Sequence, residues 1–256
     1  MPSLSSAVSF NTMEKPVESE IQQVRAELMS FVYTVSHDLN APLRAVVNFS
    51  RMLSEKYSDV LDERGQHYLA FIEDGGQKAQ AMLNGLLQFS RLNTQSQEPV
   101  LVDCDSLIKS CVTMLHEDIE KQQATIEFSS LPIVMADADQ LLQLFLALIS
   151  NAIKFHAPNQ PPKVSIFAET GDSGHYFRVQ DDGIGIDVAY HSRIFELFKR
   201  LHTDREYEGI GMGLTLAQKI VDRHLGKIWV EPVLPRGTAF CFTLPFRGPL
   251  SAESTF

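Results

Sequence analysis

Residues 17–53 read VESEIQQVRAELMSFVYTVSHDLNAPLRAVVNFSRML, and their apolar positions recur in alternating steps of four and three. This spacing is typical of a coiled-coil seam and predicts one long helix that starts after Pro16. From Val35 the next step is four where three was due, and such a stutter predicts local unwinding. Pro42 follows inside the helix and predicts a kink, because proline lacks the backbone donor that a helix needs. The seam consists of Val17, Ile21, Val24, Leu28, Phe31, Val35, Leu39, Pro42, Val46, Phe49 and Leu53.

A second helix with the same spacing is predicted beyond a turn at residues 57–63. The two helices form a hairpin with an apolar seam on each arm. One hairpin cannot bury both seams by itself, so we expect two chains to pair into a four-helix bundle and form a homodimer. The seam of the second helix consists of Tyr68, Ile72, Gly75, Ala79, Met82, Leu86 and Phe89.

Beyond a polar linker expected at residues 93–98, the pattern changes to short strands that alternate with helices. This alternation predicts an α/β sandwich domain, so the chain as a whole falls in the α+β class. The strands are expected at residues 125–128, 163–169, 176–180, 227–233 and 238–244, and the helices at residues 106–121, 138–155 and 214–224. The expected division of the chain is a flexible tail at 1–16, the hairpin at 17–94, the sandwich domain at 100–247 and a C-terminal tail at 248–256.

The 256 residues carry 22 Lys and Arg against 32 Asp and Glu, which gives a net charge of −10. A negative chain is repelled by nucleic-acid phosphates and anionic lipids, so we expect neither nucleic acid nor a membrane as a partner. The longest apolar run, at residues 141–149, is shorter than the roughly 20 residues that span a bilayer. Three scattered cysteines and the lack of an N-terminal signal pattern favour a reducing, cytoplasmic location.

His37 is the first candidate for chemistry. It stands two positions after Val35, roughly 200° around a helix, so it faces away from the seam and should be exposed. A neutral imidazole is a competent nucleophile near pH 7, and Asp38 can hold one ring nitrogen so that the other is free to attack. On spacing alone, an ordinary solvated surface histidine is the favoured interpretation.

The second candidate is the helical stretch SNAIKF at residues 150–155. Asn151 and Lys154 are three positions apart and share one helix face. An amide oxygen suits a metal ion, and the neighbouring ammonium suits a phosphate. The polar edge of an ordinary helix would show the same two residue types.

Two glycine runs form the third candidate. DDGIGI at 181–186 follows a predicted strand, and EGIGMGL at 208–214 opens a predicted helix. Glycines before a helix N-terminus let the backbone approach an anionic phosphate closely, although ordinary turns also contain them. The polar segment at 202–208 reads as a lid. The residues singled out in the two runs are Asp181, Gly183, Gly185, Gly209, Gly211 and Gly213.

Five motifs in this order closely resemble the sensor histidine kinases of two-component signalling. The resemblance extends from about residue 31 to residue 246 and is strongest to the soluble, phytochrome-like kinases. It implies a dimerisation and phosphotransfer hairpin followed by an ATP-binding domain of the Bergerat type. The motifs are SHDLNAPLRA (36–45), SNAIKF (150–155), DDGIGI (181–186), the phenylalanine-box stretch IFELFKRLHT (194–203) and EGIGMGL (208–214).

The resemblance also implies a role for each candidate. His37 would accept the phosphoryl group from ATP, and Asp38 would orient its ring. Asn151 would hold Mg²⁺ on the phosphates of ATP, with Lys154 close by on phosphate. The phosphoryl group would then pass to an Asp in the receiver domain of a separate response regulator.

The remaining implied roles concern the nucleotide. Asp181 would accept a hydrogen bond from the adenine amino group, and either Lys199 or Arg200 would reach the γ-phosphate. The five glycines would shape the pocket: Gly183, Gly185, Gly209, Gly211 and Gly213.

Two other functions are alternatives to the kinase. A gyrase-like or chaperone-like ATPase would use the same nucleotide fold, but the His37 motif on a coiled-coil hairpin argues against it. A scaffold with a decayed nucleotide site is disfavoured because Asn151, Asp181 and all five glycines are present.

Three further expectations concern what the sequence lacks. Only about 16 residues precede the coiled coil, fewer than the roughly 40 that a domain needs to fold, so we expect a separate sensor protein to act in trans, unless this sequence is a fragment of a longer protein. Ala147 stands one helical turn before Asn151, where ATP-hydrolysing relatives carry a Glu base, so hydrolysis should be negligible. Ala41 stands one turn after His37, where kinases that also dephosphorylate their regulators carry a polar residue, so phosphatase activity should be weak.

Overall fold

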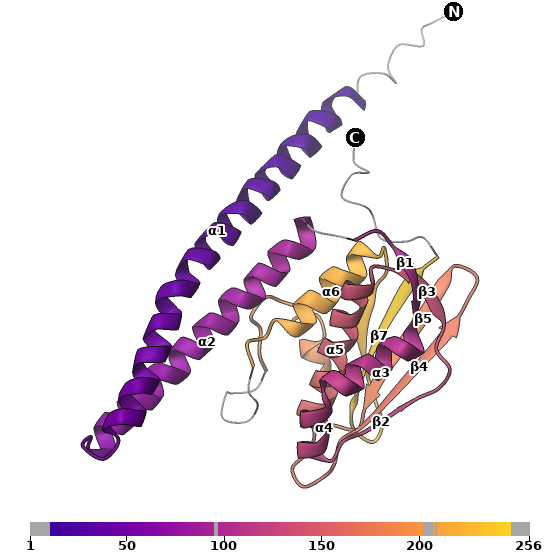
Figure 1. Cartoon of the computed structure of the whole chain (residues 1–256). Coiled ribbons are helices and arrows are strands. Elements are labelled where there is room, and N and C mark those ends of the chain that lie inside the picture. The colour runs from indigo at the N-terminus through magenta and orange to yellow at the C-terminus, as the bar shows by residue number, and fades with distance from the viewer. Residues whose placement is uncertain (1–10, 95–96, 202–206, 208, 247–256) are drawn as a thin grey trace, which may run out of the picture. The chain divides into compact units, whose positions relative to one another are not determined.

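The computed structural model describes residues 11–94, 97–201, 207 and 209–246. The chain divides into two units, Met1–Asn93 and Thr94–Phe256, which are described separately (Figure 1). Within the described residues, no helix combines the length and apolar character needed to cross a membrane.

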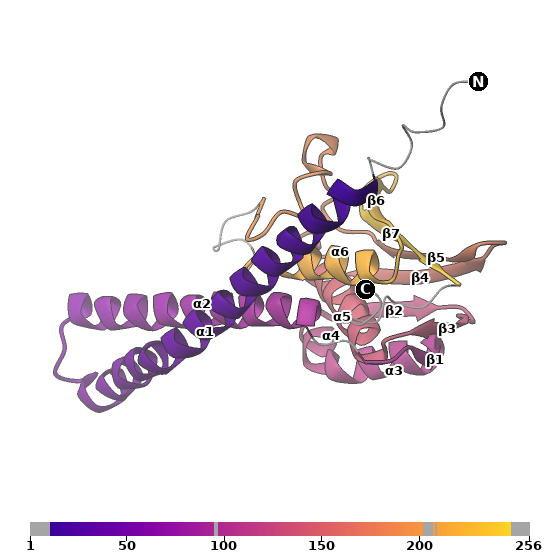
Figure 2. The ribbon, with the colours of Figure 1, turned by 90° about the horizontal axis from the view of Figure 1, so that it is seen from above.

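The first unit is a helical hairpin made of α1 (Asn11–Tyr57) and α2 (Glu63–Thr94), as the sequence predicted. Asp62 caps the second helix, because its Oδ1 accepts a hydrogen bond from the Gly65 N–H at 2.8 Å. The two helices run antiparallel from the connecting turn, which Figure 2 shows from above.

Helix α1 differs from its prediction at its start. It begins at Asn11, before Pro16, and the predicted tail therefore ends earlier than residue 16. The residues Met13, Glu14 and Lys15 favour helix, which accounts for the added turn. Farther on, the helix continues through the stutter and Pro42 without a break.

Close packing joins the two arms at Gly76. This glycine is buried, and a Cβ there would lie 2.5 Å from Val47 Cγ2 on α1. An ion pair between Arg51 Nε and Glu73 Oε1, 3.0 Å apart, ties the arms beside this contact. A glycine in the middle of a helix costs stability, and here it allows the close approach.

Most of the predicted seam stays exposed in the single hairpin. Among the described residues of this unit, Val47 and Leu92 are the buried hydrophobic side chains. The exposed seam residues are Val24, Leu28, Phe31, Val35, Leu39, Val46, Phe49 and Leu53 on α1, and Tyr68, Ile72 and Met82 on α2.

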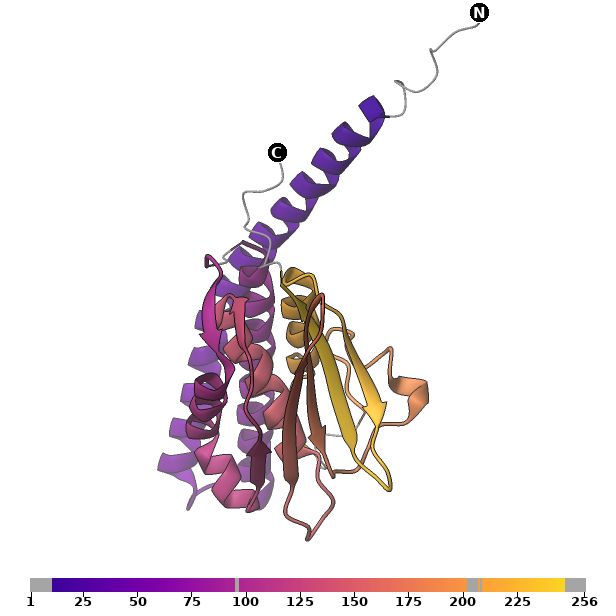
Figure 3. The same ribbon diagram turned by 90° about the vertical axis from the view of Figure 1, so that its right-hand side faces the viewer.

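The second unit is an α/β sandwich. Its larger sheet has the strand order β2-β4-β5-β7-β6, in which only β2 and β4 run parallel, and Figure 3 shows these strands side by side. The strands are β2 (Thr125–Phe128), β4 (Lys163–Thr170), β5 (Gly174–Asp181), β6 (Ile228–Pro232) and β7 (Thr238–Pro245).

Helices cover one face of this sheet. Helix α5 (Ala138–Lys154) packs on β4 and β5, and α6 (Gly213–Arg223) packs on β6 and β7. At the centre of the core, the Phe145 ring of α5 meets Phe177 and Phe242 edge-on, at centroid distances of 5.7 and 5.6 Å. The predicted order of a helical hairpin followed by an α/β sandwich is thus confirmed.

Two details of the sandwich differ from the prediction. A small second sheet pairs β1 (Val100–Asp103) with β3 (Ile133–Ala136), and the sequence had not predicted these strands. The helix expected at 106–121 is broken at Leu115 into α3 (Cys104–Met114) and α4 (His116–Gln122). Two acidic residues in the first turn of α4 favour a new helix start there.

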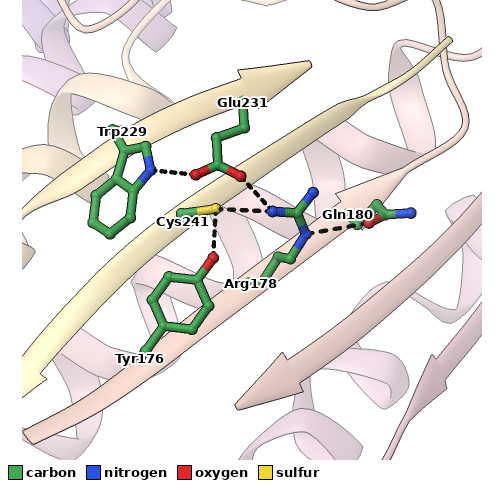
Figure 4. A network of polar contacts seen from close by, with 6 residues as sticks. All are labelled: Tyr176, Arg178, Gln180, Trp229, Glu231 and Cys241. Carbon is green, nitrogen blue, oxygen red and sulfur yellow. Dashed lines mark hydrogen bonds and ion pairs between the residues drawn. The ribbon is translucent and has the colours of Figure 1, made fainter. Parts of the chain in front are cut away.

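A polar network ties three strands together on the sheet face opposite the helices (Figure 4). Arg178 Nη1 on β5 donates to Glu231 Oε2 on β6 at 2.5 Å, and Trp229 Nε1 donates to Glu231 Oε1 at 2.8 Å. Tyr176 Oη donates to the buried Cys241 Sγ of the intervening strand β7. Donation from Trp229 and then from Arg178 lowers the pKa of Glu231, which stays ionised. The network fixes the edge strand β6 against β5 and β7.

Candidate functional site

His37 lies on α1 with its side chain 73% exposed, as the helix geometry predicted. Its Nδ1 lies 3.2 Å from Asp38 Oδ1, and the Asp38 side chain is 71% exposed. The Tyr33 ring stacks on the imidazole one turn earlier, with ring centroids 6.4 Å apart. When Nδ1 carries the proton and donates to the carboxylate, Nε2 keeps the lone pair that a nucleophile needs.

The second unit contains a cavity of about 200 Å³. Of the ten residues predicted to bind the nucleotide, nine line it: Asn151, Lys154, Asp181, Gly185, Lys199, Arg200, Gly209, Gly211 and Gly213. Gly183 does not line it. A Cβ at Gly183 would lie 2.3 Å from Phe155 O, so this glycine lets the strand-end loop pack behind the cavity wall.

Asp181 occupies the end of β5 and is buried. Its Oδ1 accepts hydrogen bonds from the Gly183 N–H at 2.9 Å and from the Thr238 N–H at 3.0 Å. Within the described residues no hydrogen bond reaches Oδ2, which remains available to a donor in the cavity. Burial raises the pKa of Asp181 to about 6, although the two hydrogen bonds from backbone N–H groups act in the opposite direction and lower it. The carboxylate is therefore ionised at neutral pH and can accept from an amino group.

Helix α5 positions Asn151 and Lys154. Asp137 caps its start by accepting from the Gln140 N–H at 3.1 Å, and the Asp137 N–H donates to Nε2 of the buried His224. The other end of α5 brings Asn151 and Lys154 to the cavity. Lys154 Nζ lies 4.6 Å from the centroid of the Phe155 ring. An amide oxygen and an ammonium thus stand together on one wall.

The N-terminus of α6 forms another part of the lining through Gly211, Met212 and Gly213. Gly211 has a φ of +73°, and a Cβ there would lie 2.7 Å from Lys199 O, so only glycine fits. The first turn of α6 contains no acidic side chain. Free backbone N–H groups and the helix dipole make such an end suitable for phosphate.

Sequence reasoning missed several parts of the cavity. Thr238 and Phe240 of β7 line the cavity. Next to them, Gly237 has a φ of +122°, and a Cβ there would lie 2.1 Å from Asp181 O. Their place beside Asp181 depends on strand pairing, which no local motif signals. The predicted lid at 202–208 lies outside the described residues except for Tyr207, which lines the cavity.

The cavity has few groups that could hold a metal ion. Among the described residues, no cluster of three or more His, Cys, Asp or Glu side chains has the arrangement of a metal site. Mg²⁺ in nucleotide sites is commonly held by one or two protein groups together with phosphates and water. The Asn151 amide oxygen fits that donor set.

Two family models match the chain. The model described as "His Kinase A (phospho-acceptor) domain" matches residues 27–95, and "Histidine kinase-, DNA gyrase B-, and HSP90-like ATPase" matches residues 136–248. The phytochrome-like protein Cph1 of Synechocystis sp. is 38% identical over 225 residues. The chain belongs to the sensor histidine kinases. The match to a phospho-acceptor domain ahead of the ATPase domain distinguishes the chain from gyrase-type and chaperone-type ATPases.

Other similarities agree with this membership. The chain is 39% identical over 229 residues to cyanobacterial phytochrome A of Nostoc sp.. The match to Cph1 covers 88% of the chain and the match to phytochrome A covers 90%, but the chain spans only 30% of the length of each of these relatives. The crystal structure of full-length ShkA in complex with AMPPNP has a TM-score of 0.64 and 27% identity, and the match covers 87% of this chain and 47% of ShkA.

Proposed function

We propose that the protein is an ATP-dependent protein-histidine kinase that phosphorylates its own His37 and then passes the phosphoryl group to an Asp of a response regulator. The observation that carries the proposal is the exposed imidazole of His37, held at Nδ1 by Asp38, in a chain whose cavity is lined by nine of the ten residues predicted to bind a nucleotide. The hairpin at 17–94 would be the phosphotransfer domain, and residues 100–247 would be the ATP-binding domain.

The first step forms a bond between His37 Nε2 and the γ-phosphorus while the bond from phosphorus to the β–γ bridging oxygen breaks and ADP leaves. The Asp38 carboxylate accepts a hydrogen bond from the Nδ1–H group and stabilises the positive charge that develops on the imidazole. In the second step a regulator carboxylate attacks the phosphorus, and the N–P bond breaks. Positioning and charge neutralisation supply most of the catalysis in such transfers.

The cavity residues would bind and orient the nucleotide. Asp181 accepts from the adenine amino group, Lys154 lies on phosphate, and Asn151 holds Mg²⁺. When bound, Mg²⁺ neutralises negative charge on the phosphate oxygens. Either Lys199 or Arg200 supplies a further cation at the γ-phosphate. The loop glycines let the backbone close around these groups.

The exposed seam of the hairpin supports a homodimer in which two hairpins form a four-helix bundle. Eleven seam residues with apolar or aromatic side chains would gain burial in such a bundle, and isolated helical hairpins rarely leave so much apolar surface in water. We propose a cytoplasmic location for this dimer. A separate sensor protein acting in trans stays a prediction of the sequence.

Incubation of the purified chain with γ-labelled ATP and Mg²⁺ tests the proposal. We expect a label that is stable to base, labile to acid and absent from the His37→Gln variant. Replacement of another exposed histidine, His67→Gln, serves as the matched control and should leave the label unchanged. Free phosphate without protein label would indicate an ATPase instead, and neither product would indicate a scaffold.

A further inference from the structure

Tyr33 lies one helical turn before His37 on α1, and its ring packs along the imidazole. The two ring centroids are 6.4 Å apart and the ring planes are tilted by only 19°, which is a stacked arrangement. Tyr33 stands two positions after the seam residue Phe31, so it points away from the seam, as His37 does. With 42% of its surface exposed, Tyr33 belongs neither to the seam nor to a buried core.

The second arm of the hairpin holds the turn of α1 that carries Tyr33. The guanidinium carbon of Arg91, in the last turn of α2, lies 6.0 Å from the centroid of the Tyr33 ring. A cation at this distance from the face of an aromatic ring is attracted to it. Next to Arg91, the buried Ser90 donates from Oγ to Met29 O, one turn before Tyr33, at 3.1 Å. The position of the Tyr33 ring is therefore supported from α2 as well as from its own helix.

The His37 side chain itself has few contacts that could select its orientation. The backbone is tied down one turn later, where Asn40 Nδ2 donates to Asn84 Oδ1 on α2 at 3.4 Å. The side chain, however, is 73% exposed and is not enclosed by packing. In a helix an imidazole has two common χ1 rotamers and a twofold choice at χ2, which gives about four orientations. The Tyr33 ring along one face and the Asp38 carboxylate at Nδ1 together favour one of them.

We propose that Tyr33 is a positioning residue that keeps the His37 imidazole in the orientation in which Asp38 holds Nδ1 and Nε2 is free to attack. The proposal rests on the proposed function, because it concerns the nucleophile of the same transfer. Tyr33 forms no bond in the reaction. It acts by reducing the orientations that the imidazole must give up before it attacks, and a group that is already oriented reacts faster.

Autophosphorylation of the full chain by γ-labelled ATP, followed over a range of ATP concentrations, measures this contribution. Tyr33→Ala should lower the rate at saturating ATP by about fourfold, the number of orientations that become available. The KM for ATP should stay within about 1.5-fold, because the residues predicted to bind the nucleotide belong to the second unit. Tyr33→Phe keeps the stacking ring and should keep the wild-type rate.

Tyr57 offers a matched control on the same helix. It is also 42% exposed, and its ring also has a cation nearby, since Lys56 Nζ lies 5.5 Å from the ring centroid. At 1.5 Å per residue, Tyr57 lies about 30 Å along α1 from His37, too far to contact the imidazole. Tyr57→Ala should therefore leave both the saturated rate and the KM unchanged.

A double-mutant cycle tests the part played by Arg91. Arg91→Gln removes the cation beside the Tyr33 ring and should slow autophosphorylation by about twofold. In the Tyr33→Ala background the same change should have no further effect, because Arg91 acts through the ring. Equal losses in the two backgrounds would contradict this coupling.

The orientation of the imidazole is measured without ATP, from the three-bond NMR couplings between the backbone and Cγ of His37. Wild type and Tyr33→Phe should show one dominant χ1 rotamer, and Tyr33→Ala an average of two. Equal couplings in wild type and Tyr33→Ala, or equal saturated rates, would show that the proposal is wrong. If Tyr33→Ala does not fold, Tyr33→Leu replaces it, because leucine favours helix and has no aromatic ring. A wild-type chain without label on His37 overturns the proposed function and this role with it, and that outcome is distinct from equal rates in wild type and variant.

Discussion

Asp181→Asn should raise the stability of the protein and weaken its binding of ATP. The Asp181 carboxyl is buried, and burial raises its pKa from 3.8 to about 6. At 1.36 kcal/mol per pH unit, this rise corresponds to a destabilisation of about 3 kcal/mol at pH 7. The amide of Asn carries no charge, and its Oδ1 can still accept the two backbone hydrogen bonds.

The same change removes the acceptor for the adenine amino group. The Asn side chain would direct an NH₂ group at that amino group, so a charged hydrogen bond is lost and two donors face each other. A hydrogen bond to a charged group contributes about 1.5–3 kcal/mol, so the affinity for ATP should fall by about 10-fold to 150-fold.

The pH dependence follows from the direction of the pKa change. Well below pH 3.8 the carboxyl is protonated in both the folded and the unfolded chain, and wild type and variant should be equally stable. As the pH rises through 3.8 towards 6, the unfolded carboxyl ionises first, so the wild type loses stability relative to the variant. Well above pH 6 the carboxyl is ionised in both states, and the difference should be constant.

Urea unfolding at pH 4, 5, 6 and 7, together with calorimetric titration of ATP at pH 7, measures both effects. Asp182→Asn is the matched control, because Asp182 is the neighbouring carboxylate, stands outside the cavity lining and, among the described residues, accepts a hydrogen bond from the Lys163 N–H alone. The control should change the affinity for ATP by less than twofold. An Asp181→Asn variant that is less stable than wild type at pH 7, or that binds ATP equally well, would refute the reasoning.

Hydrolysis of ATP to free phosphate should be negligible beside histidine phosphorylation, because Ala147 places a methyl group where a water-activating base would stand; phosphate release as fast as label transfer in a coupled assay would contradict this. Dephosphorylation of the regulator should be slow, because Ala41 cannot orient a water molecule. Ala41→Asn should accelerate it without loss of autophosphorylation. Rapid decay of the phosphorylated regulator with the wild-type chain, followed on a gel, would contradict this expectation. Gly76→Ala should destabilise the hairpin by about 1–3 kcal/mol, because a Cβ there would lie 2.5 Å from Val47 Cγ2. A thermal midpoint equal to that of the wild type would exclude this packing.

The elements with strong periodicity or clear capping could be predicted from the sequence. Helix α5 was expected at 138–155 and runs Ala138–Lys154, because its apolar positions and the Asp137 cap agree. The turn between the helices of the hairpin was expected at 57–63, and α2 begins at Glu63 behind the Asp62 cap. Four-residue strands such as β1 and β3 contain too few positions to establish an alternation, so they were missed.

The cavity was predictable where its residues lie within a local motif. The glycine runs and the Asn151–Lys154 pair have spacings that follow from loop and helix geometry, and all of these residues except Gly183 line the cavity together. Thr238 could not be predicted, because its backbone reaches Asp181 only through the antiparallel pairing of β5 and β7. Tyr207 lies in a segment without a core pattern, and its contact with Phe155 joins residues 52 positions apart.

Identification of the phosphorylated ring nitrogen tests the central claim most directly. The protein, labelled with ¹⁵N in its histidines and phosphorylated with ATP, is measured by NMR for coupling between ³¹P and each imidazole nitrogen. Because Asp38 lies 3.2 Å from Nδ1 of His37 and the imidazole is exposed, the account predicts one phosphohistidine, at His37, with the N–P bond on Nε2. A phosphoryl group on Nδ1 of His37, or on any other histidine, would contradict it.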